Sequence, residues 1–147
     1  MGKETSGGGD GGSRRWAALA LLCAAQFVVV LDVNVVLVAL PSIGRELGFS
    51  DQYLQWVVSA YVLVFAGFLL LAGRVADLFG RRRVFMLGLA LFGGASLACG
   101  LAGSQAALLI ARALQGLGAA VVAPAALSII TTAFVEARER NLALGVW

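Results

Sequence analysis

Two ionisable residues lie inside long apolar segments of this 147-residue chain, and both could do chemistry there. Asp32 lies past the middle of the apolar run 16–40, and Arg112 lies near the start of the run 106–132. A charge at the centre of a membrane span costs about 2.5–3.5 kcal/mol on insertion scales, so such residues usually have a partner or a function. A static ion pair is the structural alternative, but proton or cation binding is favoured.

The composition places the chain in a membrane. Hydrophobic residues make up 61% and charged residues 13%, whereas soluble domains are about 45–50% apolar and about 25% charged. We predict an all-α membrane protein with four spans, each long enough for a hydrocarbon core of about 30 Å, and the start of a fifth. The predicted spans are residues 16–40, 56–79, 84–102 and 106–132, with the fifth starting at 142–147. Residues 1–15 are predicted to form a disordered cytoplasmic tail, because 2–13 are polar and rich in glycine.

The spans alternate in direction because their connections are short. The first and fourth spans therefore run in opposite directions, which lets Asp32 and Arg112 lie at similar depth and neutralise each other. Asn34 lies on nearly the opposite helix face from Asp32 and is expected to hydrogen-bond a neighbouring helix.

Basic residues are distributed unevenly between the two ends of the spans. Arg45 lies alone at one end, whereas the opposite end carries Lys3, Arg14, Arg15, Arg74, Arg81, Arg82, Arg83, Arg138 and Arg140. Because cytoplasmic loops carry the excess of Lys and Arg, we predict a cytoplasmic N-terminus and a cytoplasmic 81–83 loop. A cleaved secretory signal is disfavoured, since the first apolar run exceeds the roughly 7–15 residues of a signal core.

The stretch GRVADLFGRRRVF, residues 73–85, contains an acid that membrane topology does not explain. Asp77 lies in the last turn of the second span, where the helix dipole disfavours a negative charge. Gly80 is a natural helix stop, and the arginines after it suit the cytoplasmic surface. We therefore expect Asp77 to pair with one of these arginines or with one on a helix not contained in the chain. A pair that breaks in another conformation would act as a latch.

The fourth span carries a stripe of Arg112, Gly116, Ala120 and Pro124 at intervals of four residues. Small residues allow helix backbones to approach closely in membranes. Packing explains Gly116, Gly118 and Ala120, but it does not explain the charge of Arg112.

Several functional classes are disfavoured. The charged and nucleophilic groups are too few and too scattered to form a catalytic set, so an enzyme is not expected. The chain has no His, and Cys23 and Cys99 lie far apart in apolar runs. No metal or cofactor site is therefore indicated. Nucleic-acid binding is not expected, since the basic residues follow membrane topology.

Three motifs resemble those of the major facilitator superfamily. Gly73, Asp77, Gly80, Arg81 and Arg82 are similar in type and spacing to its signature between the second and third helices. Arg112 with Gln115, Gly116 and Gly118 resembles its fourth-helix motif, and LDVNVVLVALP (31–41) resembles the first-helix motif of the fourteen-helix drug:proton antiporter branch.

This resemblance implies the N-terminal part of a proton-coupled transporter that exports drugs or other lipophilic small molecules by alternating access. It implies a proton or cation site at Asp32, coupling through Arg112, and a cytoplasmic gate at Asp77 and the arginines after Gly80. The implied setting is the plasma membrane, and the implied partners are lipid, protons, a lipophilic or cationic substrate and the remaining helices. The alternatives are an importer of a small metabolite and a non-transporting, oligomeric four-span protein.

Overall fold

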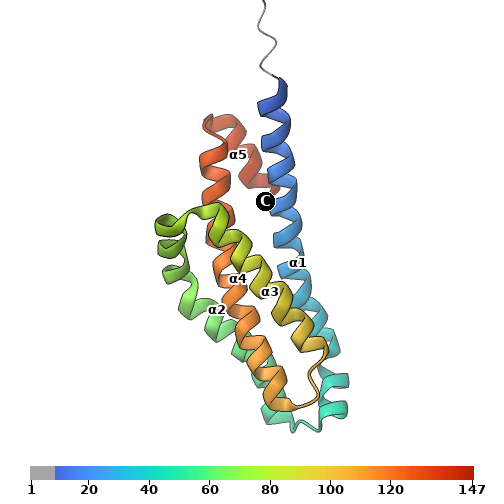
Figure 1. Cartoon of the computed structure of the whole chain (residues 1–147). Coiled ribbons are helices and arrows are strands. Elements are labelled where there is room, and N and C mark those ends of the chain that lie inside the picture. The colour runs from blue at the N-terminus through green and yellow to red at the C-terminus, as the bar shows by residue number, and fades with distance from the viewer. Residues whose placement is uncertain (1–8) are drawn as a thin grey trace, which may run out of the picture.

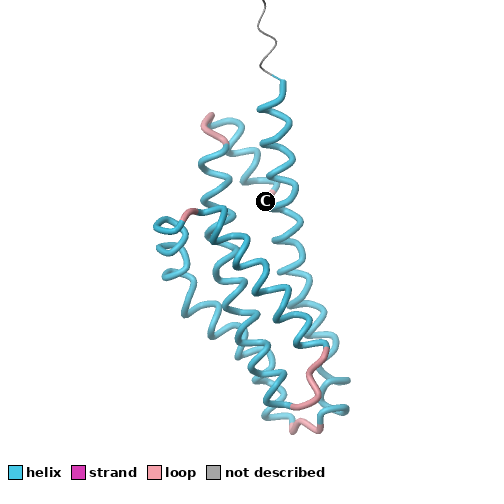
Figure 2. The backbone as a smooth tube through the Cα atoms, viewed as in Figure 1, coloured by secondary structure: helices cyan, strands magenta, loops and turns pink. Residues whose placement is uncertain are grey.

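The structure is a computed structural model in which residues 9–147 are described, and these residues form five helices and no strand (Figures 1 and 2). The helices are α1 (Gly9–Leu47), α2 (Asp51–Phe79), α3 (Arg81–Gly100), α4 (Gln105–Ala133) and α5 (Ala137–Val146). The predicted all-α fold is confirmed. The part of the predicted tail that comprises residues 1–8 lies outside the described residues.

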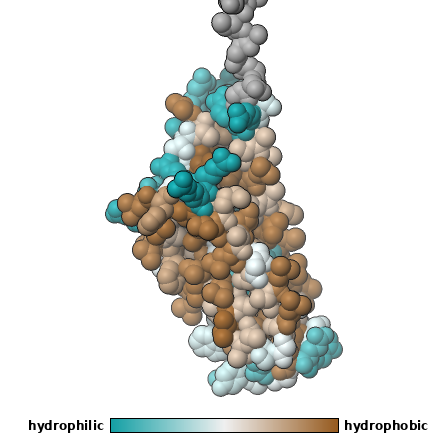
Figure 3. All heavy atoms as spheres, viewed as in Figure 1, coloured by the Kyte–Doolittle hydropathy of each residue, from teal (hydrophilic) through white to brown (hydrophobic). Residues whose placement is uncertain are grey.

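Helices α1 to α4 are each long and apolar enough to cross a membrane. On the face shown in Figure 3, hydrophobic side chains form a broad band across the middle, and hydrophilic residues gather toward the two ends. Many large apolar side chains of these helices are exposed, Leu70 and Val38 among them. Lipid therefore has to cover this surface, and the chain is a multi-pass membrane protein.

Helix α1 extends beyond the predicted span at both ends. It begins at Gly9 rather than at residue 16, and it continues through Pro41 to Leu47. Proline is tolerated inside membrane helices, because neighbouring groups can satisfy the carbonyl that it leaves free. The helix ends at Gly48, whose φ of 66° lies in the left-handed region, and Phe49 N donates to Gly44 O at 3.0 Å. This is a Schellman cap, in which glycine rather than proline ends the helix.

The other helices also begin earlier than the apolar runs predicted. α2 starts at Asp51 instead of about residue 56, and α5 starts at Ala137 instead of 142. Hydropathy marks only the part of a helix that lies in lipid, whereas the helix itself continues to its cap. Ser104 is such a cap, since its Oγ accepts a hydrogen bond from Ala107 N at 3.2 Å.

Helix α4 packs against both α2 and α3 along most of its length, and α1 packs more sparsely against α4 and α2 (Figure 1). The core includes Leu22 and Val29 of α1, Tyr61 of α2, Phe92 of α3, and Ala119, Val122 and Ile130 of α4. α1 has no extensive contact with α3. The polar site lies where α1, α2 and α4 meet.

Candidate functional site

Asp32 and Arg112 form an ion pair inside the bundle, as their predicted depths allowed. Arg112 Nη1 lies 2.8 Å from Asp32 Oδ2. The Arg112 side chain is 1% exposed and that of Asp32 is 16% exposed. The antiparallel arrangement of α1 and α4 brings the two residues to the same level. Because Arg112 is shielded from solvent, its charge needs compensation within the protein.

Gln115 completes this compensation from the next turn of α4. Its Nε2 donates to Asp32 Oδ1 at 2.7 Å, and its Oε1 accepts from Arg112 Nη1 at 2.6 Å. Both oxygens of Asp32 therefore accept a hydrogen bond from α4. We call Asp32, Arg112 and Gln115 the polar triad. The sequence analysis named Gln115 only as part of the motif that resembles the fourth-helix motif of the superfamily. Its position three residues after Arg112 places both side chains on one face of the helix, which is a signal that they contact the same partner.

Helix α2 supplies two further contacts to Arg112 that the sequence analysis missed. Arg112 Nε donates to the backbone carbonyl of Val57 at 3.1 Å, and Arg112 Cζ lies 4.5 Å from the centre of the Tyr61 ring. Such a cation–π contact is worth about 2 kcal/mol or more when desolvated. The guanidinium group is thereby held by three helices.

The small residues of α4 bring its neighbours close to the site. A Cβ atom added to Gly116 would lie 3.1 Å from Tyr61 C and against its carbonyl oxygen. A Cβ atom added to Gly118 would lie 2.7 Å from Phe92 N on α3. These glycines therefore pack against two different helices. Pro124, further along the predicted stripe, lies near Gly73, whose added Cβ would be 3.9 Å from Pro124 Cβ.

At the opposite end of the bundle, Asp77 pairs with Arg81, one of the two kinds of partner predicted for it. Asp77 Oδ1 lies 3.4 Å from Arg81 Nη2, and both side chains are exposed. Arg81 Nη1 also donates to Ser128 O of α4 at 3.3 Å. Gly80, with φ of 93°, forms the turn between α2 and α3. Arg82 is exposed and makes no ion pair within residues 9–147.

The prediction for Asn34 was wrong. Its Nδ2 donates to Val30 O of its own helix at 2.8 Å, instead of bonding a neighbouring helix. A side-chain bond to the carbonyl four residues earlier is the local alternative open to such a polar residue in a helix.

The chain resembles known transporters over most of its length. Residues 22–147 match the Major Facilitator Superfamily. The chain is 56% identical over 134 residues to a puromycin resistance protein of Streptomyces alboniger. The aligned residues make up 91% of this chain and 27% of that protein. It is 54% identical over 129 residues to a cephamycin export protein of Amycolatopsis lactamdurans, and the aligned residues make up 88% of this chain and 26% of that protein.

A multidrug resistance protein of Mycobacterium tuberculosis, Stp, is 47% identical over 121 residues, with 82% of this chain and 22% of that protein covered. The chain thus spans about a quarter of the length of these relatives. The family is one of transporters and not of enzymes, as the sequence predicted, and one of these relatives is named as an export protein. The chain belongs to the Major Facilitator Superfamily.

Proposed function

We propose that the chain is the N-terminal part of a proton-coupled exporter of drugs or other lipophilic small molecules that works by alternating access. The names of its relatives support this function, since they refer to puromycin resistance, cephamycin export and multidrug resistance. The three motifs support it as well, because they lie on α1, at the turn between α2 and α3, and on α4.

The observation that carries the proposal is the bonding of Asp32. Each of its carboxylate oxygens accepts a hydrogen bond, Oδ2 from Arg112 and Oδ1 from Gln115. A proton on either oxygen would remove the negative charge that Arg112 compensates, so protonation weakens the charge-assisted bonds within the polar triad. Proton binding thereby changes how α1 is held against α4, and this change is the coupling step that we propose.

A cationic substrate can replace the proton in this scheme. When Arg112 moves away from Asp32, the carboxylate needs another positive partner in a region of low dielectric. A lipophilic cation or a proton satisfies this need, and only one of them at a time. Competition of this kind is sufficient to exchange a proton for a substrate.

The cytoplasmic gate is proposed to use Asp77 and Arg81. Their exposed contact of 3.4 Å is weak by itself, since exposed ion pairs contribute about 0–1 kcal/mol. Its proposed role is conformational, because Arg81 also reaches Ser128 of α4 and so ties the turn at Gly80 to that helix. Burial of this pair against the remaining helices would close the cytoplasmic side.

The proposed setting is the plasma membrane with the N-terminus in the cytoplasm. The excess of Lys and Arg at the end of the bundle that carries the 81–83 loop supports this orientation. Lipid, protons and the remaining helices of the transporter are the proposed partners.

The test is export by cells that express the full-length protein with Asp32→Asn. Asparagine keeps the size of the side chain but can be neither charged nor protonated. We expect loss of energy-dependent export of compounds such as puromycin, whereas Asp51→Asn, an exposed acid at the start of α2, should export normally. Unchanged export by the Asp32 variant would refute the coupling role, and energy-dependent accumulation by the unaltered protein would identify an importer.

A further inference from the structure

A cavity of about 340 Å³ is lined by Asp32 and Arg112 of the polar triad and by residues at the end of the bundle opposite the 81–83 loop. Asp32 and Arg112 lie at its inner end. Toward the loops 48–50 and 101–104 the lining includes Glu46 and Leu47 at the end of α1 and Ala102 of the second loop, and the exposed Glu46 marks the mouth. Glu46 follows Asp32 by fourteen residues on α1, a rise of about 21 Å along the helix axis. The cavity therefore extends from a loop end of the bundle into the depth of the membrane.

The lining of this cavity suits water. Polar and ionisable groups line it from three helices: Asp32 and Glu46 from α1, Ser96 and Cys99 from α3, and Arg112 from α4. A buried water needs two to four polar partners, and at about 30 Å³ each the volume holds about ten waters. Ionisable residues within membrane spans usually face such water-filled cavities.

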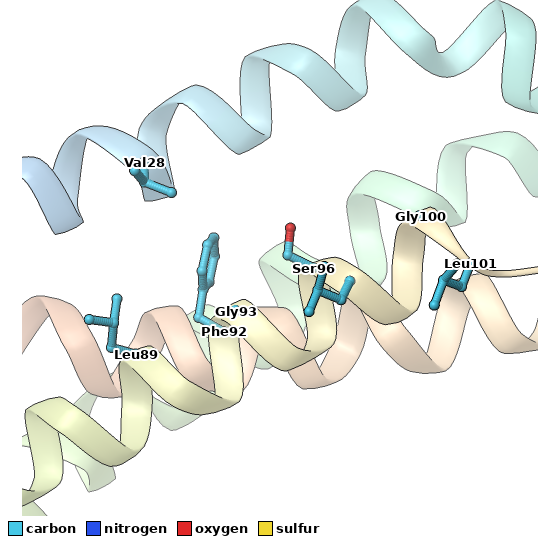
Figure 4. Close-up of a pocket in the computed structure, with 8 residues that line it drawn as sticks. Val28, Leu89, Phe92, Gly93, Ser96, Gly100 and Leu101 are labelled. Atoms are coloured by element: carbon cyan, nitrogen blue, oxygen red, sulfur yellow. The ribbon is translucent and has the colours of Figure 1, made fainter.

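A second cavity lacks the ionisable lining of the first one. It has about 550 Å³ and lies between α1 and α3, where Val28, Leu89 and Phe92 line it and Ser96 is its polar side chain. In Figure 4, Phe92 and Ser96 point from α3 toward α1. No titratable residue lines this second cavity. Of the two, only the 340 Å³ cavity reaches the polar triad.

We propose that the 340 Å³ cavity is a water-filled passage through which protons reach Asp32 from the outer side, with Glu46 as the proton-collecting group at its mouth. The inference rests on the proposed function for its orientation and for the use of the proton. An exposed carboxylate at the mouth of a cavity attracts cations and raises their local concentration. The lining residues of the passage belong to α1, α2, α3 and α4 and to the loop between α3 and α4.

Few other charges surround Glu46. On the passage wall, the titratable groups are Asp32, Cys99 and Arg112, and α2 contributes Val57, which does not titrate. Arg45 and Asp51 belong to the same end of the bundle but do not line the passage.

The chain contains its own probe of water access. Cys99 lines the passage and Cys23 does not, and neither cysteine is in a disulfide. The Cys99 thiol donates to Gln115 Oε1 at 3.6 Å, so it lies beside the polar triad. The full-length protein in intact cells is treated with a membrane-impermeant, trimethylammonium-bearing methanethiosulfonate, and modification is measured for each cysteine by mass spectrometry. We expect Cys99 to react and Cys23 to remain unmodified.

A larger side chain in the passage should block access to Cys99, and the same substitution outside the passage is its control. Gly100 lines both cavities, and a Cβ added there meets nothing within 4 Å, so the backbone leaves room for the first atom of a larger side chain in Gly100→Leu. Gly94 on the same helix has equal space but does not line the passage, so Gly94→Leu is the control. We expect Gly100→Leu to suppress modification of Cys99 and Gly94→Leu to leave it unchanged. An unreactive Cys99, or equal modification in both variants, would overturn the passage.

The role of Glu46 is tested separately. Glu46→Gln should slow proton-driven export without changing the modification of Cys99, and Asp51→Asn should change neither. Unchanged export by the Glu46 variant would remove Glu46 from the proposal. If Asp32→Asn abolishes export while Cys99 stays unreactive, the passage is wrong and the proposed function stands. If Cys99 reacts and Gly100→Leu protects it while Asp32→Asn still exports, the water access stands and the proton-coupled function is wrong.

Discussion

Replacing Gly116 by alanine is the sharpest test of how α2 and α4 pack around the polar triad. The added Cβ would lie 3.1 Å from both C and Cα of Tyr61, whereas carbon atoms pack best at about 3.5–4.0 Å. The obstacle is backbone on both sides, so no side chain can rotate away. α2 would have to withdraw from α4 by several tenths of an ångström.

Two costs follow from this displacement. Overpacking of a well-packed interface typically costs about 1–3 kcal/mol. The withdrawal of α2 also lengthens the 3.1 Å bond from Arg112 Nε to Val57 O, one turn from Tyr61. Hydrogen bonds to charged groups contribute about 1.5–3 kcal/mol. We therefore expect Gly116→Ala to lower the free energy of unfolding by at least about 2 kcal/mol.

The assay is reversible unfolding of the full-length protein in mixed micelles, followed by circular dichroism as the denaturing detergent increases. Gly94→Ala is the matched control, because an added Cβ there meets nothing within 4 Å. Gain of helix propensity makes this control neutral or more stable by up to about 1 kcal/mol. Equal stability of the two alanine variants would refute the close approach of α2 and α4.

Three further predictions concern single contacts. Gln115→Leu leaves Asp32 Oδ1 without its bond partner and should destabilise the protein by about 1–3 kcal/mol, measured by the same unfolding assay. An unchanged unfolding curve would contradict the bonding of the polar triad. Asp77→Asn should change stability by less than about 1 kcal/mol because the pair with Arg81 is exposed, yet it should reduce export if the pair is the gate. Gly80→Ala should destabilise the protein by about 1–3 kcal/mol, since φ of 93° strains any residue with a Cβ, and equal thermal stability would contradict this.

The sequence was sufficient for the parts of the fold that follow from membrane physics. The cost of charge in lipid singled out Asp32 and Arg112, and alternating span directions placed them at one level. The structure joins them at 2.8 Å. Asp77 was likewise found from an unfavourable helix-end charge, and its partner Arg81 was one of the alternatives.

Contacts that depend on helix rotation could not be predicted in this way. Val57 holds Arg112 through its backbone carbonyl, and a carbonyl leaves no signal in residue type. Tyr61 faces Arg112 only because α2 and α4 approach at Gly116, which requires the relative rotation of two helices. Hydropathy also placed the end of the first span at Leu40, where the apolar run stops. The helix in fact ends where Gly48 adopts a positive φ.

The central claim is that Asp32 carries the proton that drives export, and proton movement tests it most directly. The full-length protein is reconstituted into liposomes that contain a pH-sensitive dye, and a compound found to be exported by cells is then added on one side. The account predicts that transport of the compound moves protons in the opposite direction, and that Asp32→Asn abolishes this proton movement. A pH change of equal size in the Asp32→Asn protein would contradict the account.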